Sequence, residues 1–137
     1  MYRILIPVDD DAGRASAQAA FVTGLPLVGD DVEVTVTHAL HGEELEAPDA
    51  MRNPGRVSTV RQVRDALEDA GIDVAVGEIG QPPAEGIVDL ADDIDADLLV
   101  LGGRKQSPAG KVLFGSITQE VLLDTDRPVV VTGGRDN

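Results

Sequence analysis

The sequence predicts a single-domain α/β protein, a three-layer α/β/α sandwich around a parallel sheet of five strands. Short apolar runs alternate along the chain with stretches whose apolar residues recur every three or four positions, as in repeated βαβ units. The 137 residues suffice for one hydrophobic core, and 42% of them are hydrophobic, unlike a disordered chain. We therefore expect one domain over residues 1–137, with an ordered core at about 2–132.

The first half of the chain predicts two strands and one helix. A strand is expected at Tyr2 to Val8 and a helix at Ala12 to Thr23, closed by Gly24 at a C-cap position. Val32 to Thr37 alternates between valine and polar residues and predicts the second strand. The polar segment from Leu40 to Arg56 predicts a loop.

The second half continues with helices and strands in turn. Val57, Val60, Val63 and Leu67 recur at helical spacing and predict a helix that Gly71 ends. The remaining elements are expected in this order: a strand at Ile72 to Val76, a helix after Pro83 with Ile87, Leu90, Ala91 and Ile94 on one face, a strand at Leu98 to Leu101, a helix from Ser116 to about Asp124, and a strand at Pro128 to Val131.

The polarity of each strand predicts the strand order 3-2-1-4-5. The first and fourth strands are apolar on both faces, as central strands are, whereas the third alternates like an edge strand. The fifth strand is also an edge, yet Val129, Val130 and Val131 carry no protective charge. An exposed apolar edge invites pairing. We therefore expect a homodimer through this last strand.

A glycine-rich stretch follows the predicted fourth strand. Gly102 and Gly103 come directly after it, and Gly115 precedes the helix that starts at Ser116. Glycines let backbone N–H groups reach a ligand that a Cβ would hold off, and a helix N-terminus attracts anions. Lys105 adds positive charge to this stretch of an otherwise acidic chain. The pattern predicts a phosphate-binding site.

The predicted topology brings two distant segments to one crevice. Ligands of open α/β sheets bind beyond the carboxyl ends of the strands where the chain order reverses, here between the first and fourth strands. Asp9 and Gly102 end those strands and should face the same crevice. At least one of Asp9, Asp10 and Asp11 is also expected to cap the first helix, and Ser116 is a candidate cap for the last.

Three segments of the sequence resemble the universal stress protein family. The family signature is Gly, two residues, Gly, nine residues, Gly, then Ser or Thr, and three of its four places match. These places are held here by Gly102, Lys105, Gly115 and Ser116. The opening Ile4 to Asp9 resembles the first strand of the family, and Arg127 to Val131 resembles the last. The resemblance covers almost the whole chain.

The resemblance implies that the crevice binds an adenine nucleotide, ATP or else ADP or AMP, with or without Mg²⁺. It implies that Asp9 contacts adenosine, that Ala39 lines the adenine pocket, and that the first turn of the last helix holds phosphate oxygens. It also implies dimerisation through the last strand. The expected site residues are Asp9, Ala39, Leu101, Gly102, Gly103, Lys105, Gly115, Ser116 and Ile117.

Three functions remain open at this point. The first is a regulatory nucleotide-binding protein, with at most slow ATP hydrolysis, because no nucleophile with a base and no Walker-type motif is present. The second is a stress-response dimer or scaffold that lost nucleotide binding when Lys105 replaced the second glycine of the signature. The third is a phospho-accepting receiver domain, suggested by Asp9 and Asp10 but lacking the required Asp where Gly77 to Ile79 ends the third strand.

The composition argues against other classes of protein. With a net charge of −14, nucleic acids and anionic membranes are poor partners. The chain has no cysteine, and His38 and His41 lack the carboxylate pattern of a metal site. No apolar run approaches the roughly 20 residues of a membrane span, and the N-terminus does not resemble a signal peptide, so we expect a cytoplasmic location.

The charge balance predicts salt-dependent stability, as in proteins of salt-loving cells. Asp and Glu number 25 against 11 Lys and Arg, and Lys105 and Lys111 are the only lysines. Salt shortens the screening length from about 10 Å at 0.1 M to about 3 Å at 1 M. We expect the Tm to rise by roughly 5 °C over that range, a change of about 1 kcal/mol. Circular dichroism melts measure this shift.

A non-ionic osmolyte provides the control for this experiment. Sucrose stabilises proteins through its exclusion from the surface and leaves the repulsion between carboxylates unscreened. If the Tm rises equally in sucrose of the same osmolarity, the salt effect is not electrostatic. Equal melting temperatures in low and high salt would identify an ordinary acidic protein.

Overall fold

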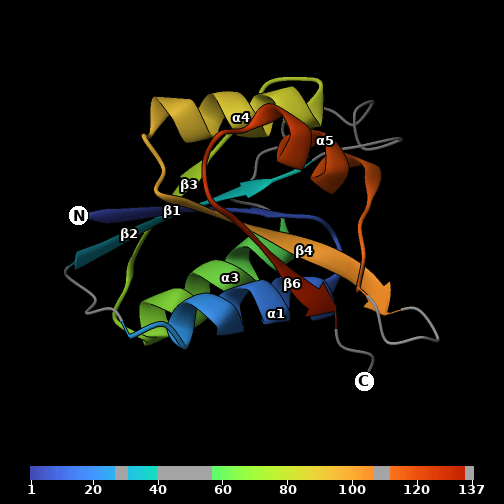
Figure 1. Cartoon of the computed structure of the whole chain (residues 1–137). Helices are drawn as coiled ribbons and strands as arrows, with labels where there is room; N and C mark the ends of the chain where they lie inside the picture. The colour runs from blue at the N-terminus through green and yellow to red at the C-terminus, as the bar shows by residue number, and fades with distance from the viewer. Residues whose placement is uncertain (27–30, 40–56, 107–111, 135–137) are drawn as a thin grey trace.

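The computed structural model describes residues 1–26, 31–39, 57–106 and 112–134. Along the chain its elements are β1 (Tyr2–Val8), α1 (Ala12–Thr23), β2 (Val32–His38), α3 (Ser58–Asp69), β3 (Asp73–Gly77), α4 (Pro83–Asp93), β4 (Leu98–Gln106), β5 (Val112–Leu113), α5 (Ser116–Asp124) and β6 (Val129–Gly134). Helices α1 and α3 cover one face of the sheet, and α4 and α5 cover the other (Figure 1).

The sheet has the predicted parallel order. Strands β3, β2, β1 and β4 follow one another, and β6 lies beside β4 as the fifth parallel strand. The register runs from Tyr2 opposite Val32 to Val8 opposite His38 between β1 and β2. The predicted order is thus confirmed, with the most exposed strand, β3, at one edge.

The region after residue 101 differs from the sequence prediction. Strand β4 does not stop at Leu101 but continues to Gln106, so Gly102 and Gly103 lie within the strand rather than after it. Residues beyond Leu101 remain extended because they pair with β6, with Gly102 opposite Thr132. The short strand β5, which the sequence did not predict, pairs antiparallel with the same end of β4.

Two apolar layers hold the helices against the sheet. On one face the buried residues of α1 and α3 pack on alternate residues of the central strands, such as Ile4, Ile6 and Val34. On the other face Ile87 of α4 and Val121 of α5 pack around Leu5, Leu99 and Leu101. Burial of each such side chain contributes about 1.5–3 kcal/mol. Strands β1 and β4 are apolar on both sides because both faces of the sheet are covered.

The helix ends use most of the predicted signals. Asp11 is the N-cap of α1 and accepts a hydrogen bond from the backbone N–H of Arg14 at 2.9 Å. Gly24 is the C-cap of α1, and Gly71 follows α3 with a φ of 81°, a conformation that favours glycine. For α5 the N-cap is Gly115, so the prediction of Ser116 as the cap is wrong by one residue.

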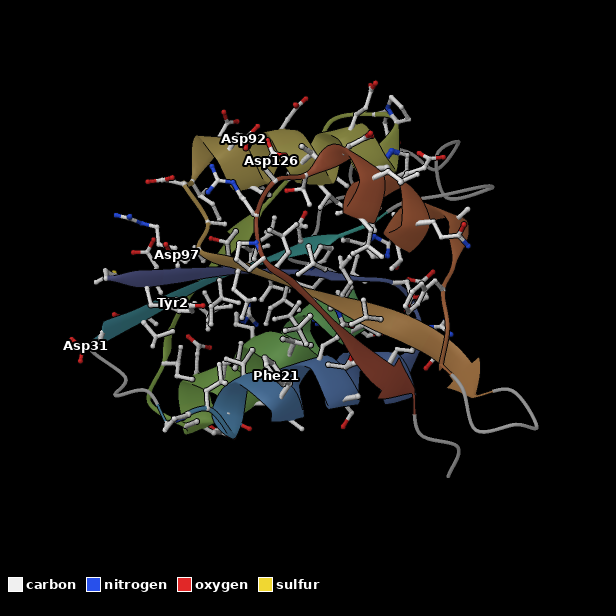
Figure 2. The ribbon with its side chains drawn as sticks, in the orientation of Figure 1. Tyr2, Phe21, Asp31, Asp92, Asp97 and Asp126 are labelled. Carbon is white, nitrogen blue, oxygen red and sulfur yellow. The ribbon has the colours of Figure 1, made fainter. Side chains whose placement is uncertain are left out.

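The amino-terminal edge of the sheet is acidic. Asp97 lies at this edge, where its carboxylate accepts a hydrogen bond from the backbone N–H of Arg3 at 2.9 Å (Figure 2). Arg127 donates to the backbone oxygen of Ala96 and pairs with Asp92 and Asp95. Desolvation opposes the charged form of Arg127, but the hydrogen bonds to these aspartates outweigh it and raise its pKa. This arginine therefore joins the start of β6 to the end of α4.

One close backbone approach fixes the start of α4. A Cβ added to Gly86 would lie 2.2 Å from the backbone oxygen of Gly80, far inside normal contact. A Cβ added to Gly80 itself would meet no atom within 4 Å. Glycine is therefore required at residue 86 by packing, although glycine weakens a helix by about 1 kcal/mol relative to alanine.

Replacing Gly86 by alanine should destabilise the fold. Helix propensity alone favours the substitution by about 1 kcal/mol, but the clash with the Gly80 backbone should dominate and give a net loss of about 1–3 kcal/mol. Urea unfolding of Gly86→Ala, with Gly80→Ala as the matched control, measures the difference. A Gly86→Ala protein as stable as the parent would contradict the packing around residue 80.

Candidate functional site

Strands β1 and β4 separate toward their carboxyl ends. Their paired residues are Ile4 with Leu98 and Leu5 with Leu99, and no further pair follows between these two strands. Pro7, near the end of β1, has no backbone N–H and cannot donate to a neighbouring strand. Since the backbone oxygen of Val8 accepts from Ala39 on the β2 side, the oxygen of Pro7 faces the β4 side.

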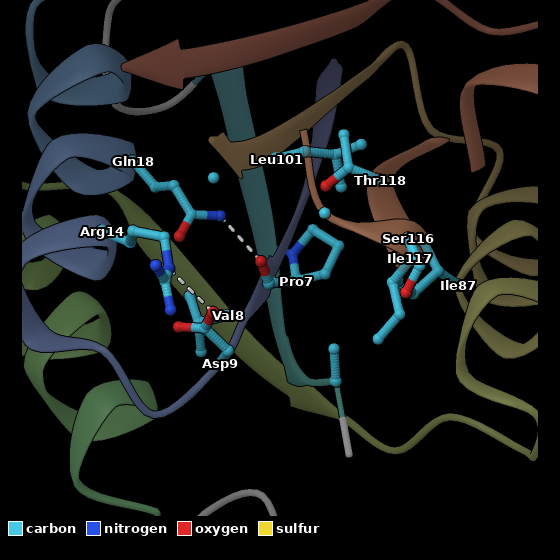
Figure 3. Close-up of a pocket in the computed structure, with 13 residues that line it drawn as sticks. Pro7, Val8, Asp9, Arg14, Gln18, Ile87, Leu101, Ser116, Ile117 and Thr118 are labelled. Atoms are coloured by element: carbon cyan, nitrogen blue, oxygen red, sulfur yellow. Dashed lines mark hydrogen bonds and ion pairs between the residues drawn. The ribbon is translucent and has the colours of Figure 1, made fainter. Parts of the chain in front are cut away.

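The side chain of Gln18, from α1, fills the point of separation. Its Nε2 donates to the backbone oxygen of Pro7 at 2.7 Å (Figure 3). It also donates to the backbone oxygen of Val100 at 3.0 Å. Only 1% of Gln18 is exposed. One amide group therefore replaces the missing ladder between two central strands and satisfies two buried carbonyl oxygens.

Asp9 follows β1 and is held on several sides. Its Oδ1 accepts from the backbone N–H of Asp11 at 2.9 Å, and its Oδ2 accepts from Nε of Arg14 at 2.8 Å. Its backbone oxygen accepts from the hydroxyl of Thr59 in α3 at 2.5 Å. The carboxylate is thus fixed in position and paired with a cation, while about a quarter of the side chain stays exposed.

The other two acidic residues of this turn have separate roles. Asp11 caps α1, and its Oδ2 lies 3.8 Å from Nη2 of Arg14. Asp10 lies 2.9 Å from Nε2 of His38, whose ring is buried at the end of β2. Of the three aspartates, Asp9 is the one on the wall of the adjoining pocket.

The carboxyl ends of β1, β2 and β4 and the start of α5 surround this pocket, which encloses about 690 Å³ with its open mouth included. The described residues of its wall are Pro7, Val8, Asp9, Arg14, Gln18, Ala39, Ile87, Leu101, Gly102, Gly115, Ser116, Ile117 and Thr118. Figure 3 shows Arg14 and Gln18 on one side and Ser116, Ile117 and Thr118 across from them. The pocket therefore has a polar wall from α1 opposite a helix N-terminus.

The structure brings together most of the residues that the sequence predicted as a site. Asp9, Ala39, Leu101, Gly102, Gly115, Ser116 and Ile117 all line the pocket. Gly103 is not on its wall, and Lys105, whose side chain lies outside the described part of the structure, pairs through its backbone with Gly134 of β6. The predicted loop at Leu40 to Arg56, with His41, lies outside the described residues, as does Lys111.

Sequence reasoning missed the wall that α1 contributes. Arg14 and Gln18 lie four residues apart and so on the same face of the helix. The buried residues of α1 are Ala15, Gln18, Ala19 and Val22, and Gln18 is the one polar side chain of the four. A glutamine within an otherwise apolar helix face was the available signal, because a buried amide needs polar partners.

Gly102 has a packing role in addition to any ligand role. A Cβ at this position would lie 3.1 Å from Oε1 of Gln18 and 3.5 Å from Cβ of Arg14. A side chain there would press on α1 and on the amide that joins β1 to β4. The absence of a side chain at Gly102 therefore lets the polar wall approach the strand.

Within the described residues, no group of three or more His, Asp or Glu side chains is placed to hold a metal ion. None of the described helices has the length and apolar character needed to cross a membrane. Helix α5 has no side-chain cap, so its first turn presents backbone N–H groups without intrahelical partners at the pocket wall. The site can thus offer an acceptor, a cation and a helix N-terminus around an apolar interior.

Known proteins resemble this chain in both sequence and fold. The model of the universal stress protein family matches residues 1–133. A universal stress protein of Mycolicibacterium smegmatis is 36% identical over 76 residues, which is 55% of this chain and 58% of that protein. The stress response protein NhaX of Bacillus subtilis is 28% identical over 127 residues, covering 88% of this chain and 69% of that protein.

Solved structures of universal stress proteins have a similar fold. A universal stress protein from Archaeoglobus fulgidus matches with a TM-score of 0.76 and 28% identity, covering 96% of this chain and 98% of that chain. The A. fulgidus protein in complex with dAMP matches with a TM-score of 0.72 and 24% identity, again covering 96% and 98%. This chain spans little more than half the length of the mycobacterial relative, at 58%. With a family model that matches nearly every residue, the chain belongs to the universal stress protein family.

Proposed function

We propose that this chain binds an adenine nucleotide in the pocket between β1 and β4, as a single cytoplasmic domain with a regulatory role in stress response. ATP is the first candidate, followed by ADP and AMP, with or without Mg²⁺. The observation that carries the proposal is the convergence of Asp9, Ala39, Gly102 and the start of α5 on one pocket. Residues far apart in the sequence meet where α/β proteins of this topology bind ligands.

The two chemical parts of the pocket suit the two parts of a nucleotide. Ala39, Ile87 and Leu101 supply apolar surface for a planar base. Across from α1, the first turn of α5 offers backbone N–H groups and the positive end of the helix dipole to a phosphate. Gly115 at the N-cap leaves that turn open because it has no side chain to occupy it.

Arg14 supplies the charge that an anionic ligand needs in this acidic protein. It is the basic residue among the described wall residues, and it already neutralises Asp9 at 2.8 Å. The protein has a net charge of −14, and an unpaired carboxylate in the pocket would add to the repulsion of a phosphate. The ion pair thus makes the pocket compatible with an anion.

Related structures support the choice of ligand. One solved neighbour is a complex with dAMP, and another, with a TM-score of 0.68 and 20% identity, is a universal stress protein in complex with cAMP. At these identities the likeness shows the fold alone. Both ligands contain adenine, a ribose or deoxyribose and a single phosphate, which is the chemistry that the two parts of this pocket suit.

We propose binding with a regulatory outcome in preference to catalysis. The carboxylate of Asp9 is engaged by Asp11 and Arg14, and the buried ring of His38 is engaged by Asp10. No hydrogen bond joins the carboxylate of Asp9 to Ser116 or Thr118, the hydroxyl side chains of the described wall. Occupancy of the pocket would instead act through α1, which forms part of the pocket wall and also contacts β6.

The alternative is a stress-response dimer or scaffold without a nucleotide. The observation behind it is Lys105 at the second glycine place of the family signature. A single biochemical measurement separates the two functions, because only the first requires an occupied pocket.

Protein purified gently in high salt should release about one adenine nucleotide per subunit on denaturation. In Gly115→Arg the new side chain should block the start of α5, and we expect at least a tenfold loss of affinity. Gly80→Arg is the matched control, since it adds the same charge where a Cβ meets no neighbour within 4 Å. Chromatography of the released nucleotide and calorimetric titration measure the two effects.

An empty parent protein that shows no thermal shift with ATP and Mg²⁺ would favour the scaffold. Equal nucleotide binding by the parent and Gly115→Arg would place the ligand elsewhere on the molecule. Loss of binding in both Gly115→Arg and Gly80→Arg would indicate that added positive charge, and not the pocket, is responsible.

We further propose that two copies of the chain pair through β6. Val129, Val130 and Val131 are all partly exposed, and among the described strands β6 pairs with β4 alone. Leu99 donates its N–H to the oxygen of Pro128, so alternate residues Val130 and Thr132 also face β4. Val129 and Val131 therefore direct their backbone groups to the open edge, where a second copy can pair with them.

Val131→Pro should convert the dimer to a monomer. Proline removes an edge-facing N–H and leaves the residues that pair with β4 untouched, a position at which strands tolerate proline. Val131→Ala keeps the N–H and should remain dimeric. Sedimentation equilibrium distinguishes the species. A monomeric parent, or a Val131→Pro protein that is folded and still dimeric, would exclude this interface.

A further inference from the structure

The amide of Gln18 has a fixed orientation. Both of its hydrogen-bond partners, the oxygens of Pro7 and Val100, are acceptors, so only the NH₂ end of the amide can face them. The two donor hydrogens are consumed by these two bonds. The side-chain oxygen must therefore point away from the strands.

That oxygen faces the pocket beside Gly102. It lies 3.1 Å from the place where a Cβ of Gly102 would be, and Gln18 is part of the pocket wall. Among the described residues, none donates a hydrogen bond to Oε1, and the residue is 1% exposed. The oxygen is therefore free to accept a hydrogen bond from a ligand group in the pocket.

The chemistry of this oxygen selects the part of the ligand that it can contact. An amide oxygen accepts hydrogen bonds and donates none, so the ligand must present an O–H or N–H there. Phosphate oxygens are acceptors at neutral pH and are unsuitable. On an adenine nucleotide the available donors are the ribose hydroxyls and the amino group of adenine.

The position of Gln18 favours the sugar. In the sheet order β2, β1, β4, the expected adenine contact Ala39 directly follows β2, and the expected phosphate site at α5 follows β4 in the chain. Gln18 lies between these two ends, at the separation of β1 and β4. The ribose joins the base to the phosphate and must occupy the middle of the pocket.

We propose that Oε1 of Gln18 accepts a hydrogen bond from a ribose hydroxyl, so that the site distinguishes ribonucleotides from their deoxy analogues. This inference rests on the proposed nucleotide function. Gln18 then has two tasks: its NH₂ joins the strands, and its oxygen reads the sugar. Because the strand contacts hold the amide rigidly, no side-chain entropy is lost when the ligand binds.

The first test uses the wild-type protein and modified ligands. Nucleotide-free protein is titrated with AMP, 2′-deoxy-AMP, 3′-deoxy-AMP and inosine monophosphate by calorimetry. Removal of the hydroxyl that Gln18 contacts should weaken binding by about tenfold to a hundredfold, and removal of the other should have a smaller effect. The side-chain amide resonances of Gln18, assigned in the same protein, should shift more with AMP than with the weaker deoxy analogue.

Variants assign the effect to the residue. Gln18→Met retains the length of the side chain but removes the acceptor, and AMP and the deoxy analogue should then bind equally. Gln62→Met is the matched control, because Gln62 also donates to a backbone oxygen, that of Ala12 at 3.1 Å, and is not on the pocket wall. It should keep the preference for AMP.

Each result has a separate meaning. Equal affinities for AMP and both deoxy analogues in the wild type would overturn the proposal while leaving nucleotide binding intact. A loss specific to inosine monophosphate would assign the oxygen to the adenine amino group and overturn the ribose assignment. Absence of binding by every nucleotide would refute the proposed function itself and this inference with it. A preference that persists in Gln18→Met, or unmoved Gln18 resonances in the wild type, would assign the hydroxyl to another residue.

Discussion

The separation of β1 from β4 is the constraint on which the site depends. A parallel sheet normally continues its ladder, and two buried carbonyl oxygens without donors would be unfavourable by about 1–3 kcal/mol each. Pro7 cannot supply a donor, and Gln18 satisfies both oxygens from the side of α1. The strands can therefore diverge without leaving polar groups unpaired, and the gap becomes a pocket at the carboxyl edge.

The charged groups around the pocket act through geometry more than through stability. The pair of Asp9 and Arg14 is partly exposed, and ion pairs of that kind contribute roughly 0.2–1 kcal/mol. Its effect is to fix both side chains, since Asp9 also accepts from the N–H of Asp11, and the backbone N–H of Arg14 donates to Asp11, the cap of α1. The same arginine lowers the repulsion that three consecutive aspartates would otherwise exert on an anion.

Much of the fold could be predicted from local sequence signals. The bounds of α1 and α5 and the strand order follow from periodicity and polarity, because those signals reflect burial directly. The meeting of Asp9 with Gly102 follows from topology alone. The continuation of β4 could not be predicted, because Gly102 and Gly103 signal a loop locally and are held extended by a distant strand, β6. The role of Gln18 likewise depends on Val100, 82 residues away.

The extension of β4 changes the significance of Lys105. In a loop, a side chain at the second glycine place would obstruct a close backbone approach to phosphate. Here the backbone of Lys105 is paired with Gly134 across the sheet, so Lys105 lies in a strand and not in a loop. Among the described residues, the groups that can contact a phosphate in the proposed site are the uncapped first turn of α5 and Arg14. On this argument the replaced glycine does not count against nucleotide binding, and the decisive features are the start of α5 and the wall that α1 presents to it.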